Sequence, residues 1–264
     1  MFWTRSKFLL NKLLSTLIIS WLFVSTLAYS AGLPEQVKKI KPSVVGVGRV
    51  APLATVSHQL IGTGFVIADG HYVVTNDHVA NAKGQEDLKY RRAVFYGEGQ
   101  RGKIIEVTDV FEDAEHDLAI LKIAEKLPAL KLADQQQIAD GTTIATTGYP
   151  MGGILGLYAA THKGIIAAFT PSITAAKNSQ QISERFLQGL RNRFMIYQLD
   201  IVAYPGNSGS PVYLAQSGEV FAVINKVFVK QTKESAISNP SGITYAIPVE
   251  HIYALAKKHN IPIE

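Results

Sequence analysis

Residues 204–211 are the stretch that most constrains what this chain can fold into. They read Tyr-Pro-Gly-Asn-Ser-Gly-Ser-Pro. Strand-like segments lie on both sides, at residues 196–203 and 212–214. A loop this short needs glycine where φ is positive or where another backbone approaches closely. The stretch therefore predicts a tight loop between two β-strands, with a serine hydroxyl at its tip.

The amides of Gly206, Asn207 and Ser208 are expected to be free, because they lie between strands and not in one. Converging amides beside an exposed serine suit acyl transfer, which needs a nucleophile and donors for the oxyanion that it creates. We predict Ser208 as the nucleophile and the three amides as its oxyanion hole. A glycine-serine hairpin turn is the alternative when this motif is taken alone.

Two stretches further upstream favour the catalytic interpretation. Residues 62–79 read as a hairpin that ends near His78, and residues 116–123 read as a strand that begins at Asp117. The chain order His, Asp, Ser on a background of β-strands is one of the known orders of a hydrolase triad. We predict His78 as the general base and Asp117 as the group that orients its ring.

These motifs resemble those of the trypsin-like serine proteases, and most of all those of the HtrA/Deg type. The matching stretches read GTGFVI, VVTNDHV, HDLAILKI, GNSGSP and SGITYAIPVEHI, and the resemblance covers residues 35–255. It implies an all-β fold of two antiparallel six-stranded β-barrels, the chymotrypsin fold, with a C-terminal helix. It also implies a serine endopeptidase that acts on extended or unfolded polypeptide without a cofactor.

The chain departs from the HtrA/Deg pattern at two points. The residue two positions after the nucleophile is usually glycine in that family, and here it is Ser210. If this position needs a positive φ, serine strains the loop by about 1–3 kcal/mol. No segment of PDZ-domain size follows the helix expected at residues 249–259. The missing segment puts peptide sensing through a PDZ domain in doubt. Ser210 and a helix expected within residues 179–193 leave a catalytically silent module that binds a peptide or partner as an alternative, and an esterase is another.

Substrate contacts follow from position relative to the nucleophile. Val202 is expected at the base of the primary pocket, with Ala203 and Tyr204 lining it. Because no carboxylate lies at the base, we expect cleavage after small or medium apolar residues such as Val, Ala or Leu. The strand that should pair with the substrate backbone by edge addition consists of Val223, Ile224, Asn225 and Lys226.

The first 30 residues have the pattern of a secretory signal peptide. Three basic residues precede an uncharged apolar run at residues 13–28, and small residues at 28 and 30 suit a cut after Ser30. An uncleaved anchor is the alternative, but the run is short for a span of about 20 residues. We expect an exported protein, periplasmic or secreted, which touches a membrane only through this segment if it is not cleaved.

Composition limits the partners and the chemistry. The whole chain has 26 basic and 21 acidic residues, but three of the basic ones lie in the signal segment, which leaves 23 against 21. Nucleic acid is therefore not expected as a partner. The absence of cysteine excludes disulfides, thiolate zinc sites and a cysteine nucleophile. The seven histidines share no metal-ligand spacing, so no metal is expected.

The remaining chain is expected to divide into an N-terminal lobe at residues 31–132 and a C-terminal lobe at residues 133–264. Within the second lobe, apolar residues at helical spacing predict an inserted helix at residues 179–193. This helix either packs on the barrel, acts as a lid over the cleft or offers a docking face for a partner. In the first lobe, Asp69 and Gly70 predict a hairpin with a type I′ turn.

Overall fold

The computed structural model describes most of the chain that follows the predicted signal peptide. The described residues are 32–51, 58–82, 90–134, 136–150, 156–172, 194–227 and 242–263. The predicted signal peptide and the helix predicted at residues 179–193 lie outside them, so both stay predictions. Of the helices within these ranges, none has the length and apolar character needed to span a bilayer.

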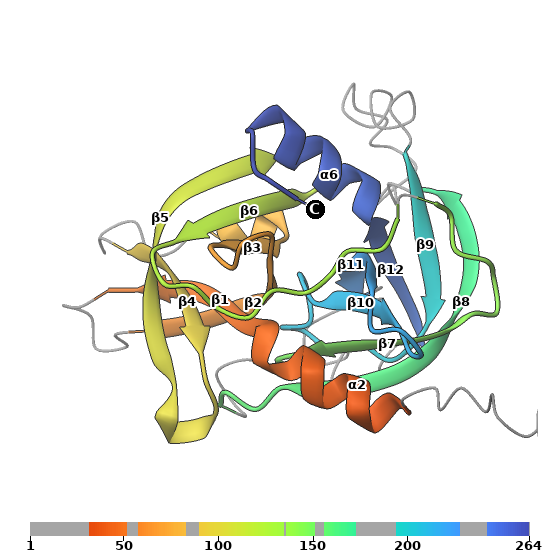
Figure 1. Ribbon diagram of the computed structural model, residues 1–264, viewed down its shortest axis with the longest axis horizontal. Helices are drawn as coiled ribbons and strands as arrows, with labels where there is room; N and C mark the ends of the chain where they lie inside the picture. The colour runs from red at the N-terminus through yellow and green to blue at the C-terminus, as the bar shows by residue number, and fades with distance from the viewer. Residues whose placement is uncertain are drawn as a thin grey trace, which may run out of the picture. The chain divides into compact units, whose positions relative to one another are not determined.

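Six strands close the first barrel, in the order β1-β2-β3-β6-β5-β4 (Figure 1). All neighbouring pairs are antiparallel, and closure removes the free edges that an open sheet would present. Its interior is filled mainly by β-branched residues, among them Val45, Val66 and Val73, each 0% exposed. The strands are β1 (Val44–Val50), β2 (His58–Ile67), β3 (Tyr72–Thr75), β4 (Arg91–Tyr96), β5 (Lys103–Asp113) and β6 (Leu118–Ile123).

The second barrel repeats this architecture, in the order β10-β11-β12-β9-β8-β7. Ile144, Leu199 and Ile224 fill its interior and are fully buried. The two closed six-stranded barrels confirm the predicted fold class. The strands are β7 (Thr143–Gly148), β8 (Ala160–Pro171), β9 (Met195–Asp200), β10 (Pro211–Leu214), β11 (Val220–Val227) and β12 (Ile243–Pro248).

A third apolar cluster joins the two barrels. It contains Phe65 of β2 and Ile120 of β6 from the first barrel, and Tyr213 of β10 from the second. The C-terminal helix α6 (Val249–Lys258) adds Ile252 and packs against strands of both barrels (Figure 1). Because burial of apolar surface is the main favourable term in folding, this shared cluster holds the barrels in one orientation.

Polar contacts add to the same seam. The hydroxyl of Tyr149 donates to the carbonyl of Val44 at 3.2 Å, from the second barrel to the first. Burial raises the pKa of Tyr149 to about 12, so the hydroxyl keeps its proton. The helix α2 (Leu33–Ile40) is tied to the second barrel by Gln36, whose side-chain amide donates to the carbonyl of Gln216 at 2.7 Å.

Candidate active site

The register of the first barrel brings His78 and Asp117 together. Strand β3 pairs with β6 so that Thr75 lies opposite Ala119. His78 lies three residues after Thr75, on the short helix α3 (Asp77–Ala80), and Asp117 lies two residues before Ala119. The two residues, 39 apart in sequence, therefore meet at one end of the sheet.

The histidine ring faces the carboxylate squarely. Nδ1 of His78 lies 2.7 Å from Oδ2 and 3.0 Å from Oδ1 of Asp117, and the His78 backbone amide donates to Oδ1 at 3.0 Å. With an ionised carboxylate and a neutral ring, Nδ1 donates to Asp117 and Nε2 keeps a lone pair. The contact thus leaves the outer ring nitrogen able to act as a base.

Asp117 adopts an unusual backbone conformation that the neighbouring residues in the sequence do not predict. Its φ is +53°, in the left-handed region that few non-glycine residues occupy. Such a conformation costs on the order of 1–3 kcal/mol and persists only where surrounding contacts impose it. One of those contacts comes from the side chain of Asn76, which donates to the Asp117 carbonyl at 3.0 Å. The sequence offered no sign of this strain.

The loop before Ser208 is a type II turn. The amide of Asn207 donates to the carbonyl of Tyr204 at 3.0 Å, and Gly206 has a φ of +100°. A type II turn favours proline at its second residue and requires a positive φ at its third. Pro205 and Gly206 occupy these two positions. The local sequence therefore explains the turn fully.

The turn corrects one expectation about the amides. Asn207 was expected to offer a free amide, but a closed type II turn uses this group internally. The amides of Gly206 and Ser208 make no hydrogen bond to any other residue that the structure describes. Two of the three predicted oxyanion donors thus stay available, and the third supports the turn that presents them.

The first barrel holds the Ser208 loop in place. Thr63 of β2 donates its backbone amide to the Ser208 carbonyl at 2.8 Å and its hydroxyl to the Gly206 carbonyl at 2.7 Å. A methyl group on Gly62 would lie 2.8 Å from Val79, the residue after His78, and 3.0 Å from the Ser208 carbonyl oxygen. The nucleophile loop and the histidine turn therefore lie against the same short segment of β2.

The second barrel holds the loop from the other side. The amide of Gly209 donates to the carbonyl of Ile224 at 2.8 Å, and the amide of Ile224 donates to the carbonyl of Ser210 at 2.9 Å. Gly209 has a φ of +85°, and a side chain there would lie 2.0 Å from the Thr63 carbonyl oxygen. Contacts from both barrels therefore fix Ser208 at the seam between them.

Ser210 does not carry the positive φ that would make serine costly at this position. The positive values of the loop fall on Gly206 and Gly209 instead. The Ser210 hydroxyl is fully buried and has no hydrogen-bond partner among the described residues. The cost of serine here is thus an unpaired hydroxyl and not a strained backbone.

The predicted substrate-binding residues divide into two groups. Val202 is 37% exposed and Tyr204 is half-buried, with its ring 5.9 Å from that of His162, whereas Ala203 is fully buried. Val223 and Ile224 are buried, and their backbone pairs with β10, β12 and the nucleophile loop. These two were therefore wrongly expected to form the edge that takes up substrate.

Asn225 lies at a bulge in β11, where the register with β12 shifts between Ile224 and Lys226. A bulge bends a strand and leaves one residue without a partner in the ladder. Beyond Ile224, β11 pairs with β12 through Lys226 and Val227, and its other side pairs with no strand among the described residues. The prediction that Asn225 and Lys226 bind the substrate backbone stays a prediction.

His116, His251 and His71 make contacts apart from the His78–Asp117 pair. His116 is held by Asp113, with its Nδ1 2.7 Å from Oδ2, and its ring stacks on that of His251 at a centroid distance of 3.9 Å. His71 places its Nδ1 3.2 Å from the carbonyl of Ile123. In the described ranges, no three His, Asp or Glu side chains converge as a metal site requires.

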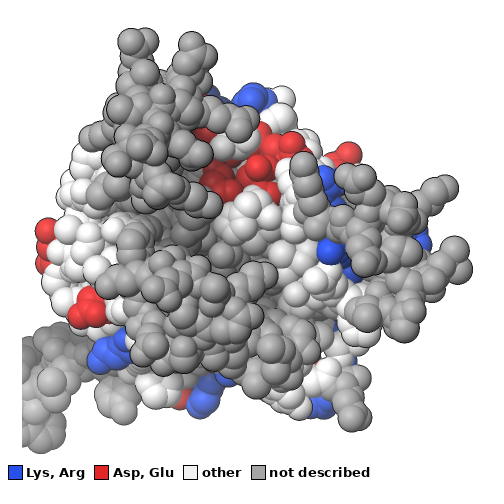
Figure 2. All heavy atoms as spheres, turned by 180° about the vertical axis from the view of Figure 1, so that it is seen from behind, with Lys and Arg blue, Asp and Glu red and all other residues white. Residues whose placement is uncertain are grey.

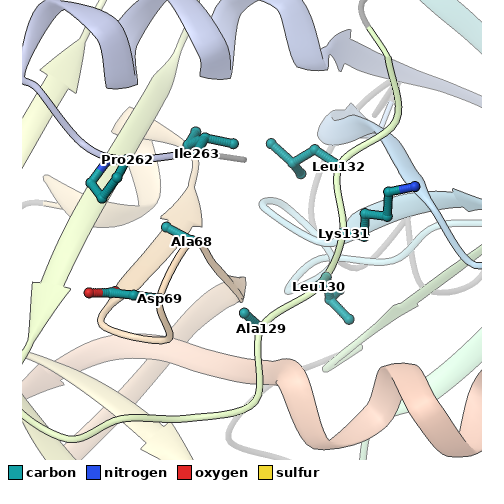
Figure 3. Close-up of a pocket in the computed structure, with 8 residues that line it drawn as sticks. All are labelled: Ala68, Asp69, Ala129, Leu130, Lys131, Leu132, Pro262 and Ile263. Carbon is teal, nitrogen blue, oxygen red and sulfur yellow. The ribbon is translucent and has the colours of Figure 1, made fainter.

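Surface features elsewhere do not compete with this site. In Figure 2, acidic side chains gather near the top of the face seen from behind, with further acidic and basic residues scattered elsewhere on it. Figure 3 shows a pocket of about 400 Å³, in which the side chains of Asp69 and Lys131 point away from each other. None of the predicted catalytic or substrate-binding residues lines this pocket. Its lining consists of Ala68, Asp69, Ala129, Leu130, Lys131, Leu132, Pro262 and Ile263.

Two closed barrels with a His–Asp pair and a serine loop at their seam define the trypsin-like class of peptidase domain. The family model described as trypsin-like peptidase domain matches residues 62–223, from the first barrel to β11. The chain belongs to this family, and within it to the HtrA type, as its relatives indicate.

The curated relatives carry HtrA and DegP names. A probable periplasmic serine endoprotease DegP-like from Halomonas elongata is 27% identical over 191 residues, covering 72% of this chain and 33% of the relative. Serine protease HTRA1 from Xenopus tropicalis is 28% identical over 233 residues, covering 86% of this chain and 43% of the relative. The chain thus spans less than half the length of these two relatives.

Solved structures agree on the fold. The HtrA-type protease AlgW with a tripeptide aligns with a TM-score of 0.61 at 23% identity, covering 87% of this chain and 63% of that one. The active form of the Rv3671c protease from M. tuberculosis aligns with a TM-score of 0.62 at 21% identity, covering 87% and 85%. At these identities the similarity concerns the fold alone.

Proposed function

We propose that this chain is a serine endopeptidase in which Ser208, His78 and Asp117 form the catalytic triad. The observation that carries the proposal is the His78–Asp117 contact at 2.7 Å, beside a type II turn in which the amides of Gly206 and Ser208 bond no other described residue. Family membership adds support, because the relatives are named as serine proteases.

In the proposed reaction, the Ser208 hydroxyl attacks the carbonyl carbon of the scissile bond, and Nε2 of His78 takes its proton. Asp117 holds the ring and stabilises the imidazolium that forms. The carbonyl oxygen becomes an oxyanion that accepts hydrogen bonds from the amides of Gly206 and Ser208. One such donor is typically worth about 10²–10³ in turnover.

The second half of the reaction reverses these transfers. The carbon–nitrogen bond breaks as Nε2 of His78 returns the proton to the leaving amine, and the acyl group stays as an ester on Ser208. A water molecule then attacks the ester, again giving a proton to Nε2. The serine recovers its proton from the imidazolium, and the second product leaves as a carboxylic acid, which ionises by losing its remaining proton to solvent.

The substrate is proposed to be extended polypeptide. Beyond Ile224, β11 pairs only with β12 among the described strands, so its other edge can offer backbone groups to an added strand, which requires an extended chain. Val202, partly exposed and uncharged, suits an apolar residue before the scissile bond. The N-terminal pattern and the periplasmic names of relatives support an exported location, periplasmic or secreted.

The first test is labelling by a fluorophosphonate, read by intact mass, on the mature protein. Wild type should gain one adduct, whereas Ser208→Ala should gain none and His78→Ala should react far more slowly. A folded wild-type protein that stays unlabelled, even with added peptide, would contradict the proposal and favour the silent binding module.

Matched peptide and ester substrates then separate a peptidase from an esterase. The proposal expects turnover of an extended peptide with Val, Ala or Leu before the scissile bond. Turnover of esters alone would overturn the peptidase assignment while leaving the acyl-enzyme intact.

A further inference from the structure

We propose that Asn76 is a positioning residue for the catalytic aspartate, acting through the backbone of Asp117. The proposal rests on the triad proposed above. Asn76 does not touch the reacting atoms. Its side-chain amide donates to the Asp117 carbonyl at 3.0 Å, across 41 residues of sequence. This contact anchors the one main-chain unit whose conformation decides where the carboxylate points.

The helix-cap position of Asn76 makes this use of its side chain unusual. Asn76 is the N-cap residue of α3, and its own carbonyl accepts the amides of Val79 and Ala80 at 3.1 and 3.0 Å. Asparagine is favoured at such positions because its side-chain oxygen accepts an amide of the first turn. Here the side chain makes no cap hydrogen bond.

The side chain of Asn76 is committed to Asp117 instead. The residue is 0% exposed, and its Oδ1 atom is buried with no hydrogen-bond partner among the residues that the structure describes. A residue selected only for helix stability would use this oxygen. Asn76 thus departs from the usual capping interaction of an N-cap side chain and contacts the proposed triad instead. Departures of this kind are expected at functional sites.

The geometry of Asp117 shows why such a contact is needed. Its φ of +53° is maintained only if neighbouring groups impose it. The Asn76 amide fixes the carbonyl of Asp117, while the backbone amide and ring of His78 fix the carboxylate. One short turn therefore holds both ends of the same residue, and Asn76 supplies the hold on the main chain.

The test uses two variants at position 76 and one control. Asn76→Ser keeps the ability to cap α3 but is too short for the Asp117 carbonyl, and Asn76→Asp keeps the shape but cannot donate when ionised. The control is Asn81→Ala, on the other end of α3, where the side chain bonds Asp77 and Glu112 at the surface. Each protein is assayed for peptide cleavage from pH 5 to 9 and for thermal unfolding.

Both position-76 variants should lose about 10- to 100-fold in kcat, in line with the effect of displacing a catalytic group by about 1 Å. KM should stay within about twofold. In Asn76→Ser the acid limb of the pH profile should move to lower pH, because a displaced carboxylate no longer stabilises the imidazolium. Asn81→Ala should keep the wild-type kcat and pH profile, whatever its melting temperature.

Three outcomes would overturn the proposal. The first is a wild-type kcat and pH profile in both variants, with only the melting temperature lowered, as for a structural residue. The second is a change in KM alone. The third is failure of both variants to fold, which would make Asn76 a folding residue. Fluorophosphonate labelling of the wild type separates these results from failure of the triad itself, since an inactive wild type would not react.

Discussion

His251 should make the folded protein less stable as the pH falls below neutral. Its side chain is 14% exposed, stacks on His116, and meets the ring of Phe194 edge-on at 5.1 Å. Burial lowers the pKa of His251 from 6.5 to about 4, and the charge of His116 acts in the same direction. Asp113 raises it by a smaller amount. Glu250 also faces the ring, with Oε1 3.5 Å from Nε2.

The sign follows from proton counting. Between pH 6.5 and pH 4, the unfolded chain binds a proton at His251 and the folded chain does not, so acidification favours unfolding. One pKa unit corresponds to about 1.4 kcal/mol. The shift therefore removes about 2 kcal/mol of stability between pH 7.5 and pH 5, and about 3 kcal/mol once the pH is well below 4.

Urea unfolding at pH 7.5 and pH 5 measures this term. A Ser208→Ala background prevents self-cleavage, and His251→Phe preserves the ring stack while removing the titration. The parent should lose about 2 kcal/mol more than His251→Phe on acidification. The control is His259→Phe, at the C-cap of the same helix, which makes the same exchange at a ring 4.9 Å from Phe111. Equal pH dependence in the parent and His251→Phe would refute the reasoning.

Three further substitutions test the serine loop and the primary pocket. Gly209→Ala places a methyl group 2.0 Å from the Thr63 carbonyl oxygen at a φ of +85°. Thermal unfolding should therefore show that the free energy of unfolding falls by at least about 1 kcal/mol, and fluorophosphonate labelling should slow at least tenfold. Wild-type values for both would disprove the close approach. Ser210→Ala removes a buried unpaired hydroxyl and should raise the free energy of unfolding by about 1 kcal/mol with labelling unchanged, whereas a loss would reveal a hidden partner. Val202→Asp should shift cleavage of a peptide library toward Lys or Arg, and an unchanged profile would place this residue outside the pocket.

The fold class could be predicted from the sequence because strands and turns are determined by residues that lie close together in the chain. Short apolar segments such as β6, which reads LAILKI, predict strands, and their close spacing predicts closed antiparallel barrels. The Tyr204–Asn207 turn was also accessible, because Pro205 and Gly206 match the second and third positions of a type II turn. What the turn does with its own amides was missed, since the Asn207 hydrogen bond follows from the closed turn geometry and not from residue type.

Turn type in the first hairpin was predicted incorrectly. A two-residue type I′ turn needs positive φ at Asp69 and Gly70, but the positive values fall on Ala68 and Gly70. Ile67 pairs with Tyr72, so four residues connect the strands. The pairing register of the whole barrel decides how many residues remain for a turn, and that register is a tertiary property.

Long-range contacts explain why Asn76 and Thr63 escaped notice. Asn76 looks like a helix cap, and only the fold shows that its side chain reaches Asp117. Thr63 looks like one more strand residue between two glycines, yet it donates to both Gly206 and Ser208. Neither contact joins residues at a spacing from which the contact could be predicted using one sequence.

Position 210 shows how a departure from a family pattern can be absorbed elsewhere in the fold. The amide of Ser210 donates to the Asn207 carbonyl at 3.0 Å and its carbonyl accepts from Ile224, in an ordinary backbone conformation. Its hydroxyl points toward Gly148 at the end of β7, where any side chain would lie 2.0 Å from Oγ. Serine at 210 therefore requires glycine at 148. The departure costs a buried hydroxyl in the packing between β7 and β10, and the turn that presents the two free amides retains its geometry.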